Sequence, residues 1–73
     1  MSEKNLYWHS TKSSFVSAIA YDHDNADLYV TLTHGSYVYH GVPNLVFEKF
    51  LAADSKGKYF NTTIKDFYSY SSR

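Results

Sequence analysis

The chain lacks cysteine, has one proline and three glycines, and contains no apolar run long enough to cross a membrane. The lack of cysteine excludes disulfides, thiolate zinc sites and thiol catalysis, and it suits a reducing cytoplasm. The first five residues also lack the apolar stretch that is typical of a signal peptide. We therefore expect a soluble cytoplasmic protein with no membrane segment.

Net charge is absent too, because seven lysine and arginine residues balance seven aspartate and glutamate residues. A strongly basic domain, the simplest signature of nucleic-acid binding, is thereby excluded, whereas a local basic patch stays open. Aromatic residues are abundant instead and make up 19% of the 73 residues. So short a chain forms a single domain over residues 1–73, and large rings must supply much of its thin core.

Three segments in the first part of the chain predict β-strands. Residues 15–21 are rich in β-branched and aromatic side chains, and residues 28–34 alternate between apolar and polar ones. The Asp- and Asn-rich residues 22–27 predict the connecting turn. A two-residue hairpin loop at Gly35-Ser36 then leads into a third strand over residues 37–41.

The hairpin register predicts which side chains share a face of the sheet. With a loop at Gly35-Ser36, His34 faces Tyr37 and Leu32 faces Tyr39. Both tyrosines then lie on the core face together with the apolar residues of the second strand. The outer face would carry Tyr29, Thr31, Thr33, Val38 and His40.

Two helices are expected after the strands. Pro43 suits a first helical turn, and helical spacing of apolar residues predicts a helix over residues 43–53. Ser55 can cap a second helix that runs to Ile64. The tail of residues 68–73 is polar and is expected to be mobile at its end. The predicted fold is α+β, a three-stranded antiparallel meander followed by two short helices packed on one face. The residues that would face the core are Leu45, Val46, Phe47, Phe50 and Leu51 in the first helix, and Phe60, Ile64 and Phe67 in and after the second.

No arrangement typical of catalysis or metal binding is present. Asp22, Asp24 and Asp27 resemble the start of a calcium loop, but Asp27 and Thr33 occupy the positions that need glycine and glutamate. The four histidines do not form a two-histidine zinc motif on a predicted helix. Nucleophile elbows and phosphate-binding glycine loops are also missing. A domain this small should lack a ligand pocket of about 300 Å³ or more. We therefore predict a non-enzymatic protein without metal or cofactor.

A first candidate surface would bind a protein partner. Trp8 comes shortly before the first predicted strand, where it either holds the N-terminal segment down or anchors a partner, because tryptophan serves in small cores and in interface hot spots. Neighbouring rings and the outer face of the sheet add further candidates. The predicted partner-binding residues are Tyr7, Trp8, His9, Tyr29 and His40.

A second candidate surface would bind RNA. Positive charge concentrates late in the chain, with aromatic rings interleaved, and lysines for phosphate and rings for stacking suit single-stranded RNA. The same pattern fits a solvated helix face whose rings turn inward. The predicted nucleic-acid-binding residues are Lys49, Lys56, Lys58, Tyr59 and Lys65.

Several short motifs between about residues 11 and 70 point together to one family. They are Ser13-Ser14, Tyr21-Asp22, Gly35, Tyr37-Val38-Tyr39, Val42-Pro43, and Ser55-Lys56-Gly57-Lys58-Tyr59-Phe60-Asn61 with Ile64. As a set they resemble the KTSC domain, a module at the C-terminus of some lysyl-tRNA synthetases that also occurs alone in small bacterial and phage proteins. Ala20 stands where members usually carry glycine. The resemblance implies a compact sheet-and-helix module with a role in RNA binding.

In size and general sequence character the chain is also similar to stand-alone phage proteins of this kind. Such a resemblance implies a transcription regulator, monomeric when free, that binds bacterial host RNA polymerase, inhibits initiation and promotes antitermination. Neutral charge and many rings suit such a protein partner, because aromatic anchors dominate the energy of protein interfaces. The alternative is an RNA-binding module of the translation or tRNA machinery.

Overall fold

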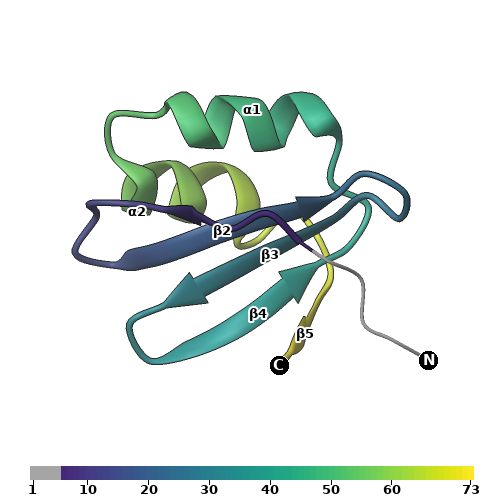
Figure 1. Ribbon diagram of the computed structural model, residues 1–73, viewed down its shortest axis with the longest axis horizontal. Coiled ribbons are helices and arrows are strands. Elements are labelled where there is room, and N and C mark those ends of the chain that lie inside the picture. Colours follow the sequence, from purple (N-terminus) through teal and green to yellow (C-terminus); the bar gives the residue numbers. More distant parts are fainter. Residues whose placement is uncertain (1–5) are drawn as a thin grey trace.

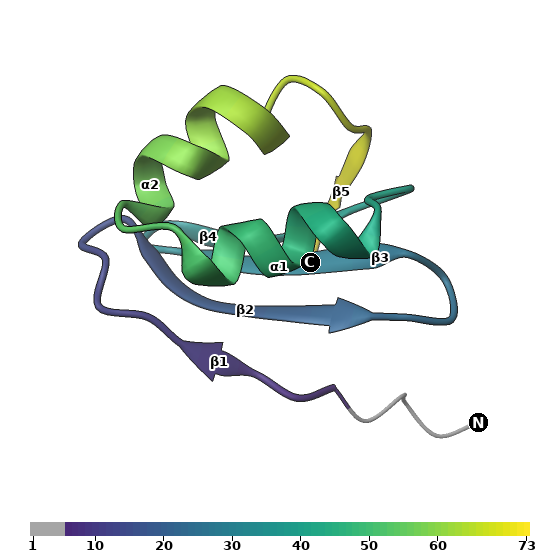
Figure 2. The ribbon, with the colours of Figure 1, turned by 90° about the horizontal axis from the view of Figure 1, so that it is seen from above.

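A computed structural model describes residues 6–73, which fold into an antiparallel sheet with helices on one side (Figure 1). Residues 1–5, where we expect no signal peptide, lie outside the described part. Two helices cover one face of the sheet (Figure 2), and the second continues into a π-helical turn. The strands are β1 (His9–Ser10), β2 (Val16–Asp22), β3 (Asp27–Leu32), β4 (Gly35–Tyr39) and β5 (Tyr70–Ser72), and the helices are α1 (Asn44–Ala52), α2 (Lys56–Tyr59) and the π-helical turn η1 (Phe60–Ile64).

The sheet is larger than predicted. The three predicted strands are present as β2, β3 and β4, and the α+β class with helices on one face is confirmed, but the sheet has five strands in the order β1-β2-β3-β4-β5. The polar segment that we expected to be mobile forms β5, in which Tyr70 lies opposite Tyr39 and Ser72 lies opposite Tyr37. Pairing with a neighbour holds such short edge strands, so their own sequence carries little signal.

The hairpin between β3 and β4 also differs from the prediction. Its turn lies at Thr33 and His34, and Gly35 already pairs with Leu32. Tyr39 consequently faces Leu28 rather than Leu32. The shift is an even number of residues, so every side chain within the strands keeps its face. Tyr37 and Tyr39 therefore lie on the helix-covered face, as predicted, whereas Thr33 belongs to the turn and not to the outer face.

Helix α1 follows Pro43, as predicted, and buries Phe47 and Phe50 against the sheet. Leu45 was predicted to face the core, but its side chain is 59% exposed. It lies in the first turn of the helix, where the chain has only just left Pro43. The apolar face of α1 is thus narrower than the sequence pattern predicts.

The second helix begins as predicted, because the Ser55 hydroxyl accepts a hydrogen bond from the Lys58 N–H. It then widens into η1, where the Lys65 N–H donates to the Phe60 carbonyl at 2.9 Å. Phe60 and Ile64 are buried on the predicted face. The wide turn ends the α-helical spacing, so Phe67, predicted to face the core, is 67% exposed.

The core lies between the sheet and the helices and consists largely of aromatic and branched residues, as the composition predicts. The Phe50 ring stacks between Tyr59 and Phe60, with centroid distances of 5.5 and 6.5 Å. Burial raises the pKa of Tyr21, and its hydroxyl donates to the Val42 carbonyl, which satisfies its polar end inside the core. The core residues are Val16, Ile19, Tyr21, Leu28, Val30, Leu32, Tyr39, Val42, Phe47, Phe50, Phe60 and Ile64.

Candidate functional site

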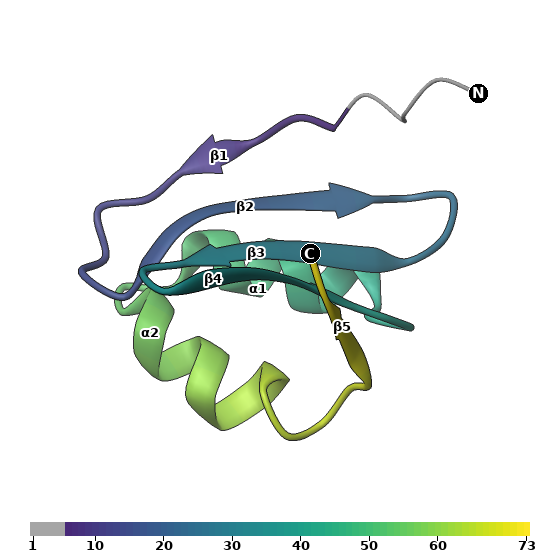
Figure 3. The ribbon, with the colours of Figure 1, turned by 90° about the horizontal axis from the view of Figure 1, so that it is seen from below.

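The face of the sheet opposite the helices is open (Figure 3), and no described helix lies over it. One row of side chains crosses this face from strand to strand, because directly paired residues point to the same side. Ala20 pairs with Tyr29, Tyr29 with Val38, and Val38 with Ser71. Continuing the β1 register by one residue places Trp8 beside Ala20.

Three side chains form a cluster on this face, which we call the open-face cluster: Trp8, Tyr29 and Arg73. The Trp8 and Tyr29 rings meet edge to face with centroids 6.2 Å apart. The Arg73 guanidinium carbon lies 5.5 Å from the Trp8 ring and 5.0 Å from the Tyr29 ring, within the range of cation–π interaction. Trp8 remains 37% exposed, so it both holds the N-terminal segment and presents surface.

Ala20 supports this cluster from below. It has no exposed surface although it lies on the open face, and its neighbours in the row are Tyr29 on β3 and, by the β1 register, Trp8. Its backbone lies in strand β2 and has no positive φ, so the position needs no special conformation. A small side chain at this position leaves room for the two rings.

A polar cluster of His40, Asp27 and Ser71 lies next to this row. His40 Nδ1 lies 3.0 Å from Asp27 Oδ1, and His40 Nε2 lies 3.1 Å from Ser71 Oγ. These contacts link the segments of β3, β4 and β5 and fix the orientation of the imidazole ring. His40 is therefore a partly exposed side chain held in one position, next to the open-face cluster.

The five predicted partner-binding residues divide between the two sides of the sheet. Trp8, Tyr29 and His40 lie together on the open face. His9 points to the helix side, where its ring is 5.8 Å from Phe47, and the 76% exposed Tyr7 packs edge to face on His9. Sequence reasoning missed Arg73, because only the pairing of β5 brings it beside Trp8, and no local signal marks that contact.

The predicted RNA-binding residues all belong to the helical layer. Lys49 lies on α1, Lys56 and Lys58 on α2, and Lys65 directly after η1. Tyr59 stacks on Phe50, and its hydroxyl donates to the Val46 carbonyl at 3.4 Å. Burial raises the pKa of Tyr59. The Tyr59 ring is thus partly buried and packs against the core, as a ring turned inward from a helix face would.

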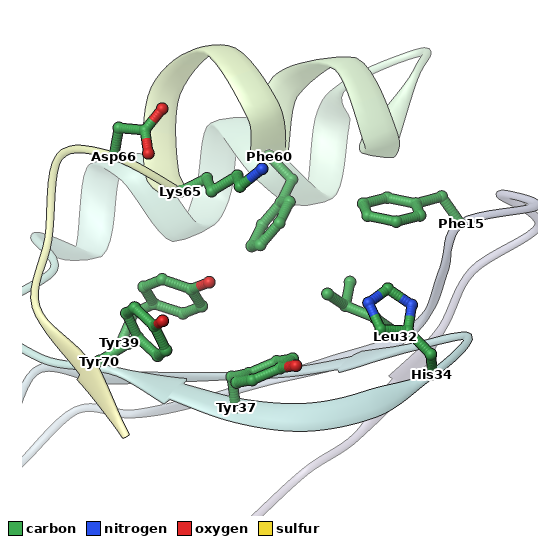
Figure 4. A pocket seen from close by; sticks show the side chains of 9 residues that line it. All are labelled: Phe15, Leu32, His34, Tyr37, Tyr39, Phe60, Lys65, Asp66 and Tyr70. Atoms are coloured by element: carbon green, nitrogen blue, oxygen red, sulfur yellow. The ribbon is translucent and has the colours of Figure 1, made fainter. Parts of the chain in front are cut away.

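A pocket of about 380 Å³ lies on the helix side, between η1 and the edge of the sheet formed by β4 and β5 (Figure 4). We expected that so small a domain would have no room for such a pocket, and this expectation is wrong. The exposed Tyr70 of β5 supplies one wall and the π-helical turn another. The sequence pattern predicts neither β5 nor the π-helical turn, so it does not predict the pocket between them.

The described residues contain neither a candidate metal site nor a candidate membrane span. Within residues 6–73, no group of three or more histidine, aspartate or glutamate side chains is placed to hold a metal ion. The helices of this part of the chain are too short and too polar to span a membrane.

Comparison with known proteins identifies the family. The sequence profile of the KTSC domain matches residues 12–68, and the chain therefore belongs to the KTSC domain family. A crystal structure of a KTSC domain protein from Yersinia pestis is similar to this chain with a TM-score of 0.91 and 31% sequence identity. The alignment covers 94% of this chain and 99% of that one. A search of curated proteins gave no match.

Proposed function

We propose that the chain is a non-enzymatic transcription regulator that docks on bacterial RNA polymerase through the open face of its sheet. In this proposal it is monomeric when free, inhibits initiation and promotes antitermination. The observation that carries the docking surface is the open-face cluster of Trp8, Tyr29 and Arg73. The choice of RNA polymerase rests on the likeness in size and character to stand-alone phage proteins.

The composition of the cluster favours a protein partner. Tryptophan, tyrosine and arginine are the residue types most enriched in interface hot spots, and hot spots lie near the centre of a contact surface. Trp8 and Tyr29 belong to the row that crosses the sheet, so a partner can contact residues around them. Arg73 holds both rings in place before binding, which reduces the entropy lost on association.

The charge on the open face also suits a protein surface. Arg73 supplies one positive charge, and Asp27 supplies a negative charge beside His40. The four lysines of the predicted RNA surface lie on the helical layer instead. A face with balanced charge and exposed rings matches the apolar centre and polar rim of a protein interface better than it matches a phosphate backbone.

A pull-down from bacterial lysate tests the proposal, with the tagged chain as bait and nuclease treatment in parallel. We expect RNA polymerase subunits to be retained after nuclease treatment and to be lost with Trp8→Ala. Loss of such an anchor weakens binding by roughly 30-fold or more. Phe67→Ala, which removes an exposed ring outside the cluster, is the matched control and should capture the polymerase normally.

Each variant must first be shown to fold, by circular dichroism and by its unfolding transition. A folded Trp8→Ala protein that captures RNA polymerase as well as the unmodified chain contradicts docking through the open face. Retention of other proteins but no polymerase subunit contradicts the choice of partner and leaves the surface to be tested with those proteins.

The same cluster favours one alternative function, an RNA-binding module of the translation or tRNA machinery. Exposed rings on an open sheet, with an arginine beside them, can stack unpaired bases. In that case only RNA is enriched in the pull-down, and every protein partner disappears with nuclease. Binding to single-stranded RNA would then depend on Trp8 and Tyr29, and its affinity would fall as salt rises.

A further inference from the structure

Six of the nine residues that line the pocket at the edge formed by β4 and β5 carry aromatic rings (Figure 4). Six rings from five separate segments follow one another around it, each in contact with the next. The successive centroid distances are 6.2 Å for His34 and Phe15, 5.9 Å for Phe15 and Phe60, 5.5 Å for Phe60 and Tyr39, 5.4 Å for Tyr39 and Tyr70, and 5.7 Å for Tyr70 and Tyr37.

The π-helical turn places one positive charge at this pocket. In η1 the Lys65 N–H bonds to the Phe60 carbonyl, so residues 60 and 65 lie one wide turn apart on the same side of the helix. The Lys65 side chain accordingly extends toward the Phe60 ring at the pocket (Figure 4). Asp66 also lines the pocket, and its negative charge contributes to the raised pKa of Tyr39. No described side chain forms an ion pair with Lys65.

We infer that this pocket binds a small planar aromatic molecule that carries one anionic group, such as a nucleoside monophosphate or an aromatic carboxylate. A flat ring offers both faces to the surrounding aromatic side chains, of which Tyr70 is 57% exposed and available for stacking. Lys65 then meets the anionic group at the rim. The volume of about 380 Å³ holds one ring system and its substituent, but no large cofactor.

Two features argue for an anion rather than a cation among the rings. Aromatic cages do bind quaternary ammonium groups, but the Lys65 ammonium extends toward Phe60 and would repel a cation held against that ring, although Asp66 also lines the pocket. Rings around a lysine match a ligand that is apolar over most of its surface and negative at one end. π-Helical turns are rare and recur at functional sites, which supports a binding role for η1.

This pocket is independent of the proposed docking surface. It shares no residue with the open-face cluster and lies on the opposite face of the sheet. The strands β3, β4 and β5 contribute to both faces through alternate residues: Tyr70 of β5, for example, lines the pocket, whereas the neighbouring Ser71 points to the open face. A negative result for ligand binding at the pocket therefore does not count against the docking surface, and the reverse also holds.

An NMR titration of the full chain tests the inference with two pairs of probes that share a ring system, one member of each pair being an anion and the other neutral. Adenosine monophosphate is compared with adenosine, and indole-3-acetate with indole-3-acetamide. We expect backbone amides of β4, η1 and β5 to shift, and each anion to bind about five-fold more tightly than its neutral partner, as a partly exposed ion pair allows. Binding of the nucleotide, of the carboxylate or of both shows which of these two classes of ligand the pocket accepts.

Two substitutions with matched controls assign the effect to the pocket. Lys65→Met should remove the preference for the anion, whereas Lys58→Met, at an exposed lysine that does not line the pocket, should preserve it. Tyr70→Leu should weaken both anions by about five-fold or more through lost stacking, whereas Phe67→Leu should not. Both sites are exposed, so these variants should fold.

Several results overturn the inference. One is that neither anion shifts the pocket amides up to its solubility limit. Another is that inorganic phosphate alone binds as tightly as adenosine monophosphate, since the rings then contribute nothing. A third is that tetramethylammonium binds more tightly than either anion, which would make the pocket a cation cage.

Discussion

The two faces of the sheet contain fully buried residues for different reasons. Phe50 is buried on the helix side, within a layer of rings that two helices and the sheet enclose. Ala20 is equally buried, but it lies on the open face, in the row that contains Tyr29. Complete burial therefore marks the core in one case and the base of a surface cluster in the other, and the two should respond differently to substitution.

The largest expected effect is on the helix side. Phe50→Ala should lower the free energy of unfolding by about 3–5 kcal/mol, because it removes a buried ring and leaves a cavity between Tyr59 and Phe60. In a domain of 73 residues that loss approaches the whole stability. Urea denaturation followed by circular dichroism measures it.

Leu45→Ala is the matched control, since it also shortens an apolar side chain in α1. Its side chain is 59% exposed, so we expect a change of no more than about 0.5 kcal/mol. Equal losses for the two variants would contradict the division of α1 into a buried face at Phe50 and an exposed first turn at Leu45.

The open face should show an intermediate effect. Ala20→Val adds volume beneath the rings of Trp8 and Tyr29, and we expect a loss of about 1–3 kcal/mol as they are pushed outward. Trp8 is the only tryptophan, so a shift of its fluorescence emission toward longer wavelength reports the displacement directly. Ala20→Gly, which adds no volume beneath the rings, should leave the emission unchanged. Unaltered emission and stability in Ala20→Val would show that the rings do not rest on Ala20.

A further effect concerns the stability of the helix side at high pH. Burial, with smaller contributions from Tyr70, Tyr37 and Asp66, raises the pKa of Tyr39 from 10.0 to about 12. The unfolded chain therefore loses this proton first, and the free energy of unfolding should fall as pH rises from 10 to about 12.

Tyr39→Phe keeps the ring and removes that titration, so it should reduce the slope of stability against pH. Urea denaturation at a series of pH values measures the slope. Part of it should persist, because burial also raises the pKa of Tyr21 and of Tyr59. An identical slope in the variant would mean that Tyr39 ionises as readily in the folded protein as in the unfolded chain.

Much of the fold was predictable, because it follows from periodic side-chain patterns within single segments. Alternation in β3 identified its buried face, and helical spacing after Pro43 identified α1. The hairpin loop was predicted at the wrong residues, but the faces of the strands were predicted correctly. The register differs by an even number of residues, so Tyr37 and Tyr39 remain on the core side. Family membership was also readable, from short motifs spread over the same segments.

The candidate sites were only partly predictable. Trp8, Tyr29 and His40 were selected from their residue types and strand positions, and they share the open face. Tyr7 and His9 were selected from their neighbourhood to Trp8 in the sequence, and the alternation of strand β1 sends His9 to the helix side. The pocket was missed entirely, because its rings come from five segments that no local pattern connects.

The sequence by itself determined the aromatic core, the faces of the central strands and the family, because each depends on residue type and on spacing within one segment. Only the tertiary structure decided that both ends of the described chain join the sheet, that Arg73 meets Trp8 and that a wide turn brings Lys65 to a ring-lined pocket. Edge strands and a π-helical turn are stabilised by contacts with residues far away in the sequence, so the sequence of these elements alone does not predict them.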